Sequence, residues 1–225
     1  MGTKIKEYCN IQALGDQAIV LYFEQKITQT IHEQVLQVAN LLKKHPLPNQ
    51  QTLIPSYASI TLRFTEPFHA AGFAQIKNAL LTLELEDSVA SQDKAPMVII
   101  PVCYGGKLGP DLLDVAKLHD LTEAEVIRLH TEPIYEVYQI GFTPGFPYLG
   151  GLPKELHTPR LPTPRRKVVA GSVGIGAAQT GVYTLDGPGG WRIIGWTSLK
   201  LFDPERDPPT LLRPGMKVKF VRTEE

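Results

Sequence analysis

The sequence predicts an α+β domain followed by a mostly β domain. In roughly the first hundred residues, apolar residues recur with strand periodicity and then with helix periodicity, in the order β-α-β-β-α-β. This order is typical of a split βαβ, ferredoxin-like unit. After Pro133 short β-prone segments alternate with Gly- and Pro-rich turns, which favours a barrel or a sandwich. We assign residues 1–96 to the first domain and 97–225 to the second.

The first elements are a strand and a helix. Ala18–Phe23 is apolar and β-prone, which favours a strand. Thr28 is expected to cap a helix, because its hydroxyl can accept a hydrogen bond from a free backbone N–H. One helix face carries the apolar residues Ile31, Val35, Val38 and Leu42. The prolines of residues 45–49 then end the helix, because proline cannot continue it.

Two strands, a helix and a last strand complete the first unit. Thr52–Ile54 is expected to form a short strand, and Ser59–Phe64 alternates apolar and polar residues as a half-buried strand does. A second helix is expected to present Phe73, Ile76, Leu80 and Leu83 on one face. Met97–Cys103 supplies the last strand, with a domain boundary close to Tyr104. The acidic and polar stretch Glu84–Ala95 is expected to be a mobile loop before it.

Two short helices open the second domain. Pro110 suits the first position of a helix ahead of Asp111. Thr122 and Glu125 form a capping box, in which a hydroxyl and a carboxylate satisfy free N–H groups at the helix start. Three further strands are expected at Ile134–Ile140, Ser198–Phe202 and Met216–Arg222.

The composition excludes several classes of function. The 23 Lys and Arg residues balance the 23 Asp and Glu residues, so no global charge attracts nucleic acid. No apolar run is long enough to cross a bilayer, and Met1–Asn10 lacks the apolar region of a secretory signal, so a cytoplasmic location is expected. Cys9 and Cys103 form no zinc-ligand pattern, and the six histidines are scattered, so no metal site is expected.

The segment Gly141–Gly151 places aromatic residues between turn residues. Such a loop can line a ligand pocket, which makes Phe142 and Tyr148 candidate binding residues. The alternative is that Phe142 and Phe146 fill the core beneath a tight loop, and residue type favours this alternative. The hydroxyl of Tyr148 needs a hydrogen-bond partner wherever it is buried.

Residues 158–167 form a proline-rich loop that holds several cations. Prolines stiffen the loop around Arg160 and Arg165. Guanidinium groups recognise carboxylate or phosphate through paired hydrogen bonds, so an anionic ligand is one interpretation. A solvated basic loop is the other, and composition alone favours neither.

A glycine-rich segment follows at residues 170–181. Gly171, Ser172 and Gly174 are candidates for presenting backbone N–H groups to an anion, and Gln179 can hydrogen-bond an amide ring in both senses. The segment matches neither a Walker A loop nor a dinucleotide-binding fingerprint, and turn formation is the commoner reason for such glycines. No nucleophile with a defensible base is present, so catalytic residues stay unassigned.

Several ordered motifs resemble the KipI/PxpB family, also called allophanate hydrolase subunit 1. They are Pro101–Gly106, Gly109–Leu112, Gly141–Leu149, Thr158–Arg160 with Pro164 and Arg165, Ala170–Ile175, Gln179–Tyr183, Pro188–Trp191 and Leu201–Pro204. The sequence departs from the family pattern at four places: Gly187 where serine is usual, Trp196 where arginine is usual, Val169 where proline is usual, and Gly176-Ala177 where Ala-Gly is usual.

The resemblance implies a cyclophilin-like β-barrel as the second domain and a role as the B subunit of an ATP-dependent 5-oxoprolinase. Such an enzyme opens the lactam 5-oxoproline to glutamate, with ATP (and Mg²⁺) shared with the A and C subunits of 5-oxoprolinase as partners. The family includes an inhibitor of a sensor histidine kinase, so a regulatory binding module is an alternative. Membership of a urea carboxylase or an allophanate hydrolase-like amidolyase is another.

Overall fold

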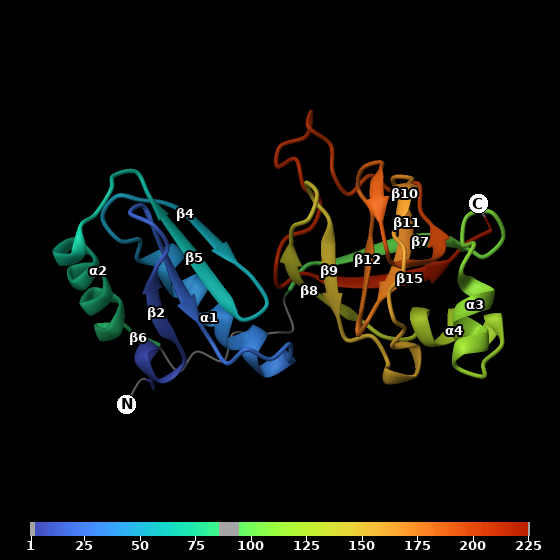
Figure 1. Ribbon diagram of the computed structural model, residues 1–225, viewed down its shortest axis with the longest axis horizontal. Helices are drawn as coiled ribbons and strands as arrows, with labels where there is room; N and C mark the ends of the chain where they lie inside the picture. The colour runs from blue at the N-terminus through green and yellow to red at the C-terminus, as the bar shows by residue number, and fades with distance from the viewer. Residues whose placement is uncertain (1–2, 86–94, 225) are drawn as a thin grey trace. The chain divides into compact units, whose positions relative to one another are not determined.

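The computed structural model describes residues 3–85 and 95–224 (Figure 1). The chain divides into two compact units, Met1–Lys94 and Ala95–Glu225, and each has its own apolar core. Most of the stretch expected to be a mobile loop, residues 86–94, lies outside the described residues.

The first unit is a four-stranded antiparallel sheet with two helices. The strand order is β2-β3-β5-β4, formed by Asn10–Ala13, Ala18–Tyr22, Ser59–Phe64 and Gln50–Pro55. A small second sheet pairs β1 (Thr3–Lys4) with β6 (Glu84–Leu85), and a 3₁₀ turn at Ile5–Glu7 follows β1. Ile60, Leu62 and Phe64 of β5 are buried, which confirms the alternation read from the sequence.

Both helices of this unit form where the sequence predicts a helix. In α1 (Gln29–Lys44) the Thr28 hydroxyl accepts a hydrogen bond from the Ile31 N–H at 3.3 Å. All four apolar residues expected on its inner face are buried. Helix α2 (Ala70–Thr82) buries Leu80 fully, and Phe73, Ile76 and Leu83 pack partly against the same core. Both helices therefore pack by the apolar faces that their periodicity defines.

The ferredoxin-like arrangement is not confirmed. The strand expected to complete it, β7 (Met97–Tyr104), belongs to the second unit, where it pairs with β15 (Lys217–Arg222) and β14 (Arg192–Trp196). Its inward residues Ile100 and Val102 are fully buried in the core of that unit. The place beside β3 is taken by β2, which precedes β3 in the chain.

The second unit is a closed seven-stranded barrel. The strand order is β11-β12-β9-β8-β15-β7-β14, and β14 pairs again with β11. The strands not yet located are β8 (Tyr135–Ile140), β9 (Pro147–Gly150), β11 (Ser172–Gly176) and β12 (Gln179–Val182). Only β7 and β15 run parallel among the pairs of this barrel, in a register from Met97 opposite Lys217 to Val102 opposite Arg222.

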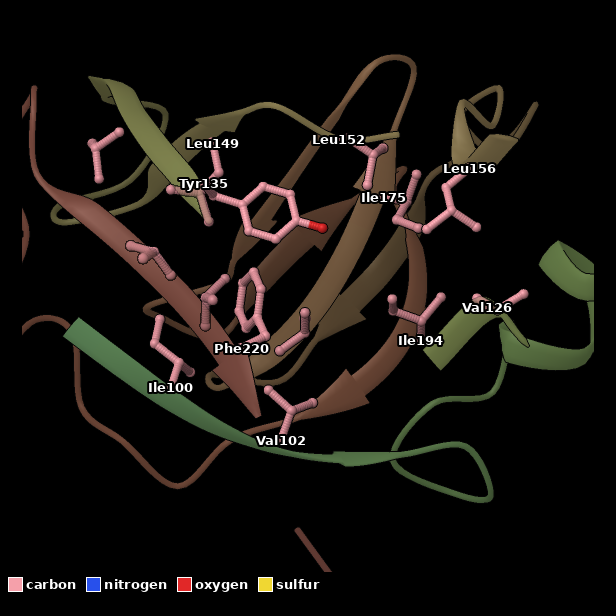
Figure 2. Packing of buried hydrophobic residues seen from close by; sticks show 14 of the residues in the cluster. Ile100, Val102, Val126, Tyr135, Leu149, Leu152, Leu156, Ile175, Ile194 and Phe220 are labelled. Carbon is pink, nitrogen blue, oxygen red and sulfur yellow. The ribbon is translucent and has the colours of Figure 1, made fainter. Parts of the chain in front are cut away.

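The barrel interior is packed with apolar side chains (Figure 2). Tyr135 and Phe220 meet edge to face, with ring centroids 5.4 Å apart. Ile175 and Ile194 extend the same cluster toward Leu156. The interior is therefore a core of side chains contributed by nearly every strand.

Two helices, α3 (Leu112–Leu118) and α4 (Glu123–Thr131), lie together at one end of the barrel (Figure 1). The capping box of Thr122 and Glu125 is present in full, as predicted. Pro110 is not the first residue of α3, because the cap is Asp111, whose N–H donates to the Ile193 carbonyl at 2.8 Å.

The strand expected at Ser198–Phe202 does not form, apart from one isolated bridge at Phe202. Two of its carbonyl groups accept hydrogen bonds from a loop residue instead. The guanidinium of Arg206 donates to the carbonyls of Lys200 and Leu201, and also to those of Pro208 and Pro209. These bonds satisfy the local backbone without a neighbouring strand.

Candidate ligand-binding site on the barrel

A cluster of aromatic residues lies on the outer face of the barrel. Successive side chains of a strand point to opposite faces, so Ile194 joins the interior while Ile193 joins this second cluster. The cluster comprises Phe146, Val168, Tyr183, Trp191 and Ile193, with Tyr148 packed against it. It is flanked by a ribbon of β10 (Arg165–Val168) and β13 (Gly187–Gly189).

Glycines make room for these rings on the sheet. A Cβ atom at Gly176 would lie 2.5 Å from the indole of Trp191, and one at Gly181 would lie 3.2 Å from both Phe146 and Trp191. A Cβ at Gly174 would meet Trp191 at 3.2 Å. The outward glycines of β11 and β12 thus form a floor on which Trp191 rests, since only glycine permits such an approach.

The aromatic rings hold one another edge to face. The Phe146 ring lies at the centre of the cluster, with centroids 4.9 Å from Tyr148, 5.3 Å from Tyr183 and 5.4 Å from Trp191. Tyr148 also meets Trp191 at 5.8 Å. T-shaped pairs of this kind stabilise a fixed arrangement beyond simple burial.

Arg160 lies against this cluster. Its guanidinium carbon is 5.8 Å from the centroid of the Trp191 ring, within the range of a cation–π contact. The residue is exposed, and within residues 3–85 and 95–224 no carboxylate forms an ion pair with it. Arg160 is thus a positioned cation whose charge is open to an incoming anion.

Arg165 has a different environment. Its Nη2 donates to Oδ1 of Asp111 at 2.7 Å, and the Asp111 side chain is almost fully buried. The Nη1 atom of Arg165 is buried and has no hydrogen-bond partner in the described part of the chain. Much of the Arg165 charge is therefore neutralised within the fold.

Both tyrosines of the cluster remain protonated phenols at neutral pH. Burial raises the pKa of Tyr148, and the nearby charge of Arg160 opposes this effect. Burial also raises the pKa of Tyr183, against the opposing influence of the Trp191 backbone N–H and of Arg160 and Arg165. The Tyr148 hydroxyl can accordingly act as a donor beside Arg160.

The backbone amides of the glycine-rich segment form hydrogen bonds within the fold. The N–H of Gly171 donates to the Tyr183 carbonyl at 2.7 Å, and that of Ser172 to the Val169 carbonyl at 3.2 Å. Gly174 lies mid-strand, paired with both β12 and β14. These amides therefore hold the fold together, while their role in ligand binding stays a prediction.

Two other candidates occupy the margins of the cluster. Gln179 is half-buried at the start of β12 and pairs in register with Gly176. Phe146 is buried, as the core interpretation predicts, but Phe142 is 62% exposed, so that interpretation is wrong for Phe142. The Phe142 ring reaches Phe146 and Tyr183 at centroid distances of 5.6 and 6.3 Å.

The departures from the family pattern are accommodated locally. A Cβ at Gly187 would meet nothing within 4 Å, so the position has space for a serine-sized side chain. The indole N–H of Trp196 donates to the Ala170 carbonyl at 2.7 Å, and its ring covers Gly171.

Sequence reasoning misses Asp111, Trp191 and Tyr183 as parts of this site. Asp111 stands out at a helix start and within the motif Gly109–Leu112, but neither signal indicates its guanidinium partner, which lies 54 residues away in the chain. Trp191 and Tyr183 stand within Gly-rich motifs, which are the one available signal.

A separate polar network lies inside the barrel. The Thr180 hydroxyl donates to the Gly174 carbonyl at 3.0 Å and so accepts from Nε2 of His130 at 2.8 Å. Nδ1 of His130 then accepts from the Tyr104 hydroxyl at 2.7 Å. Burial lowers the pKa of His130 to about 3, so this histidine is neutral and structural.

Residues 3–85 and 95–224 contain neither a metal-binding cluster nor a membrane-spanning helix. No group of three or more His, Cys, Asp or Glu residues there could hold a metal ion. No helix in the same residues has the length and apolar character needed to cross a membrane.

Known proteins match this chain over nearly its whole length. It is 41% identical over 224 residues to the B subunit of 5-oxoprolinase from Bacillus subtilis (strain 168), covering 96% of this chain and 93% of the relative. It is 45% identical over 214 residues to the B subunit of 5-oxoprolinase from Escherichia coli O157:H7, covering 94% and 95%. The crystal structure of TTHA0988 has a TM-score of 0.77 at 32% identity, over 93% of this chain and 40% of that one.

The match to a protein family covers residues 9–212 and so spans both units. It includes the glycine floor, the aromatic cluster and both arginines. The chain therefore belongs to the carboxyltransferase domain, subdomain C and D, family.

Proposed function

We propose that this chain is the B subunit of an ATP-dependent 5-oxoprolinase, which converts 5-oxo-L-proline to L-glutamate together with the A and C subunits. The observation that carries the proposal is the near-full-length identity to two proteins named as the B subunit of 5-oxoprolinase. The matched segments include the outer-face cluster, where Arg160 offers a positioned cation to an anion. Both 5-oxoproline and ATP carry the negative charge that such a cation recognises.

The chemistry explains why ATP and a cationic site belong together. An unstrained lactam is a poor electrophile, and opening its ring is uphill or marginal. Transfer of the γ-phosphoryl group to the lactam oxygen forms an O–P bond, releases ADP and turns that oxygen into a leaving group. Such a step needs cations at the phosphoryl group and donors at the developing oxyanion.

This chain alone supplies only part of that requirement. The described residues offer guanidinium and phenol donors, but the amides of Gly171 and Ser172 are used within the fold. No three-ligand metal cluster lies in the described ranges. ATP with Mg²⁺ is therefore proposed to bind in the assembled complex, with the partner subunits contributing to its site.

The test is reconstitution. This chain and the A and C subunits are purified separately, mixed, and assayed for ATP hydrolysis that depends on 5-oxoproline, with glutamate measured as product. We expect activity only in the complete mixture. Equal activity without this chain, or none in the complete and properly assembled mixture, would count against the proposal.

A further inference from the structure

The two arginines of the proline-rich loop are equivalent in the sequence but not in the structure. Arg160 is exposed over Trp191 and has no carboxylate partner among the described residues. Arg165 is bonded to a buried carboxylate, that of Asp111. An anion that approaches the loop is therefore attracted by a full charge at Arg160 and by a largely compensated one at Arg165.

The backbone on both sides of Arg160 is fixed. Thr158 is buried and exchanges two backbone hydrogen bonds with Ala177, at 3.1 and 2.8 Å. The N–H of Leu161 donates to the Gly190 carbonyl at 2.7 Å. Arg160 therefore lies between two anchored positions, which lowers the entropy lost when its guanidinium binds a ligand.

Asp111 connects the segments that surround this cation. Its Oδ2 accepts from the Ile193 N–H at 2.6 Å, two residues beyond Trp191, while Oδ1 accepts from Arg165. Arg165 in turn pairs with Gly189, two residues before Trp191. One buried carboxylate thus ties the end of the proline-rich loop to the strand that follows Trp191.

We propose that Arg160 contacts an anionic oxygen group of the substrates, and that Asp111 and Arg165 act together as positioning residues for Arg160 and Trp191. The inference rests on the proposed function and assigns different roles to two arginines that the sequence alone does not distinguish. The shared chemistry is a carboxylate or a phosphate, which 5-oxoproline and ATP supply respectively.

The first test concerns Arg160 in the reconstituted complex. Arg160→Gln removes one charge-assisted contact, so KM for one substrate should rise roughly ten- to hundredfold. A rise in KM for 5-oxoproline identifies the carboxylate as the anion, and a rise in KM for ATP identifies the phosphates. The melting temperature should not change, because Arg160 is exposed. Unchanged KM values for both substrates would overturn the inference.

The second test separates positioning from contact. Asp111→Asn leaves the charge of Arg165 without its partner. The melting temperature should therefore fall, and the KM that rises in Arg160→Gln should rise here too. The double variant Asp111→Asn with Arg165→Gln replaces the ion pair by two neutral amides that can still hydrogen-bond to each other, so the connection is kept and both quantities should return toward the wild type. If the double variant melts normally but keeps a raised KM, Arg165 contacts the anion itself and the positioning role is wrong. The double variant decides the matter even where Asp111→Asn alone does not fold.

A matched control is Lys167→Gln, on the same strand as Arg165. Lys167 pairs with Asp186 at the surface, with both side chains more than half exposed, so neither KM nor stability should change. A change equal to that of Arg160→Gln would mean that general charge in the ribbon, not Arg160, binds the anion, and would overturn the inference.

Failure of the proposed function has a distinct signature. In that case the wild-type complex itself shows no 5-oxoproline-dependent ATP hydrolysis. The inference is then decided on the full chain carrying Trp196→Phe, whose remaining tryptophan, Trp191, reports on the site by fluorescence during titration with 5-oxoproline, ATP or inorganic phosphate. A saturable response that disappears in Arg160→Gln supports the inference, and no response to any of these probes overturns it.

Discussion

The indole of Trp191 lies against Gly176 so closely that a single added carbon would come within 2.5 Å of the ring. Trp191 is 4% exposed and is the surface on which Arg160 rests. The glycines of this segment thus contribute to the site indirectly. They leave space for the Trp191 ring, and this ring positions the guanidinium of Arg160.

Gly176→Ala should displace the Trp191 ring. The new methyl group meets the rigid indole ring and not a flexible side-chain end, so we expect the barrel to lose about 1–3 kcal/mol of stability. Urea unfolding followed by tryptophan fluorescence measures this loss, because both tryptophans lie in the barrel unit. Gly187→Ala is the control, since its Cβ meets nothing within 4 Å. Equal effects of the two substitutions would show that the indole is not held by Gly176.

Phe142 is expected to contribute to assembly of the complex. It combines 62% exposure with a left-handed backbone, φ 65°, which is costly for an aromatic residue. The loop is nevertheless well fixed, because the Thr184 hydroxyl donates to the Pro144 carbonyl at 2.7 Å. Aromatic residues held rigidly at a surface are typical of interface anchors.

The assembly prediction is tested with Phe142→Gly and the co-expressed C subunit of 5-oxoprolinase. Glycine suits the left-handed backbone, so stability should stay within about 1 kcal/mol of the wild type. Size-exclusion chromatography should show a stable complex for the wild type and a weaker one for the variant. The dissociation constant should rise tenfold or more, which corresponds to a loss of about 1.4 kcal/mol of binding free energy. Ile134→Asp, at another exposed apolar residue, should leave the complex intact. A normal Phe142→Gly complex would contradict the prediction.

Local sequence signals predict elements well but not which elements pair. Three signals that depend only on residues close in the sequence are confirmed: the helix cap at Thr28, the apolar helix face that ends at Leu42, and the alternation of Ser59–Phe64. The strand Met97–Tyr104 is recognisable in the sequence, but it does not complete the sheet of the first unit as expected, because its parallel partner Lys217–Arg222 lies more than a hundred residues away in the chain. Strand pairing over such separations leaves no local pattern to read.

The candidate site shows the same division. Arg160 and Arg165 can be found because guanidinium groups between prolines are conspicuous in sequence. Their different roles depend on Asp111 and Trp191, which reach them only through the closed barrel and its ribbon. In the sequence the glycines suggest turns or exposed backbone N–H groups. In the structure they leave space for the ring of Trp191, and the sequence does not show which side chain lies opposite them.

Thr122→Ala should weaken the start of α4. The Thr122 hydroxyl accepts from the Glu125 N–H at 3.2 Å, and the Glu125 carboxylate accepts from the Thr122 N–H at 2.8 Å. Loss of the cap should cost about 1 kcal/mol in urea unfolding. Ser198→Ala, at an exposed residue outside any helix, is the control and should change little. A cost no larger than that of the control would show that the capping box does not stabilise the barrel unit.

His130 should make the barrel sensitive to mild acid. Its pKa is about 3 in the folded chain and about 6.5 when unfolded, so the unfolded state binds the extra proton first. Stability is therefore full above about pH 6.5 and falls as the pH drops toward 3, with a loss of about 1.4 kcal/mol already at pH 5.5. His130→Gln should be less stable at every pH, because bonds to Tyr104 and Thr180 are disturbed, but should not show this additional loss between pH 7.5 and 5.5. Urea unfolding at pH 7.5 and at pH 5.5 measures this loss of stability. His45→Gln, at an exposed histidine, is the control and should lose as much stability between the two pH values as the wild type does. If His130→Gln loses as much stability on acidification as the wild type, the neutral buried histidine is not the cause.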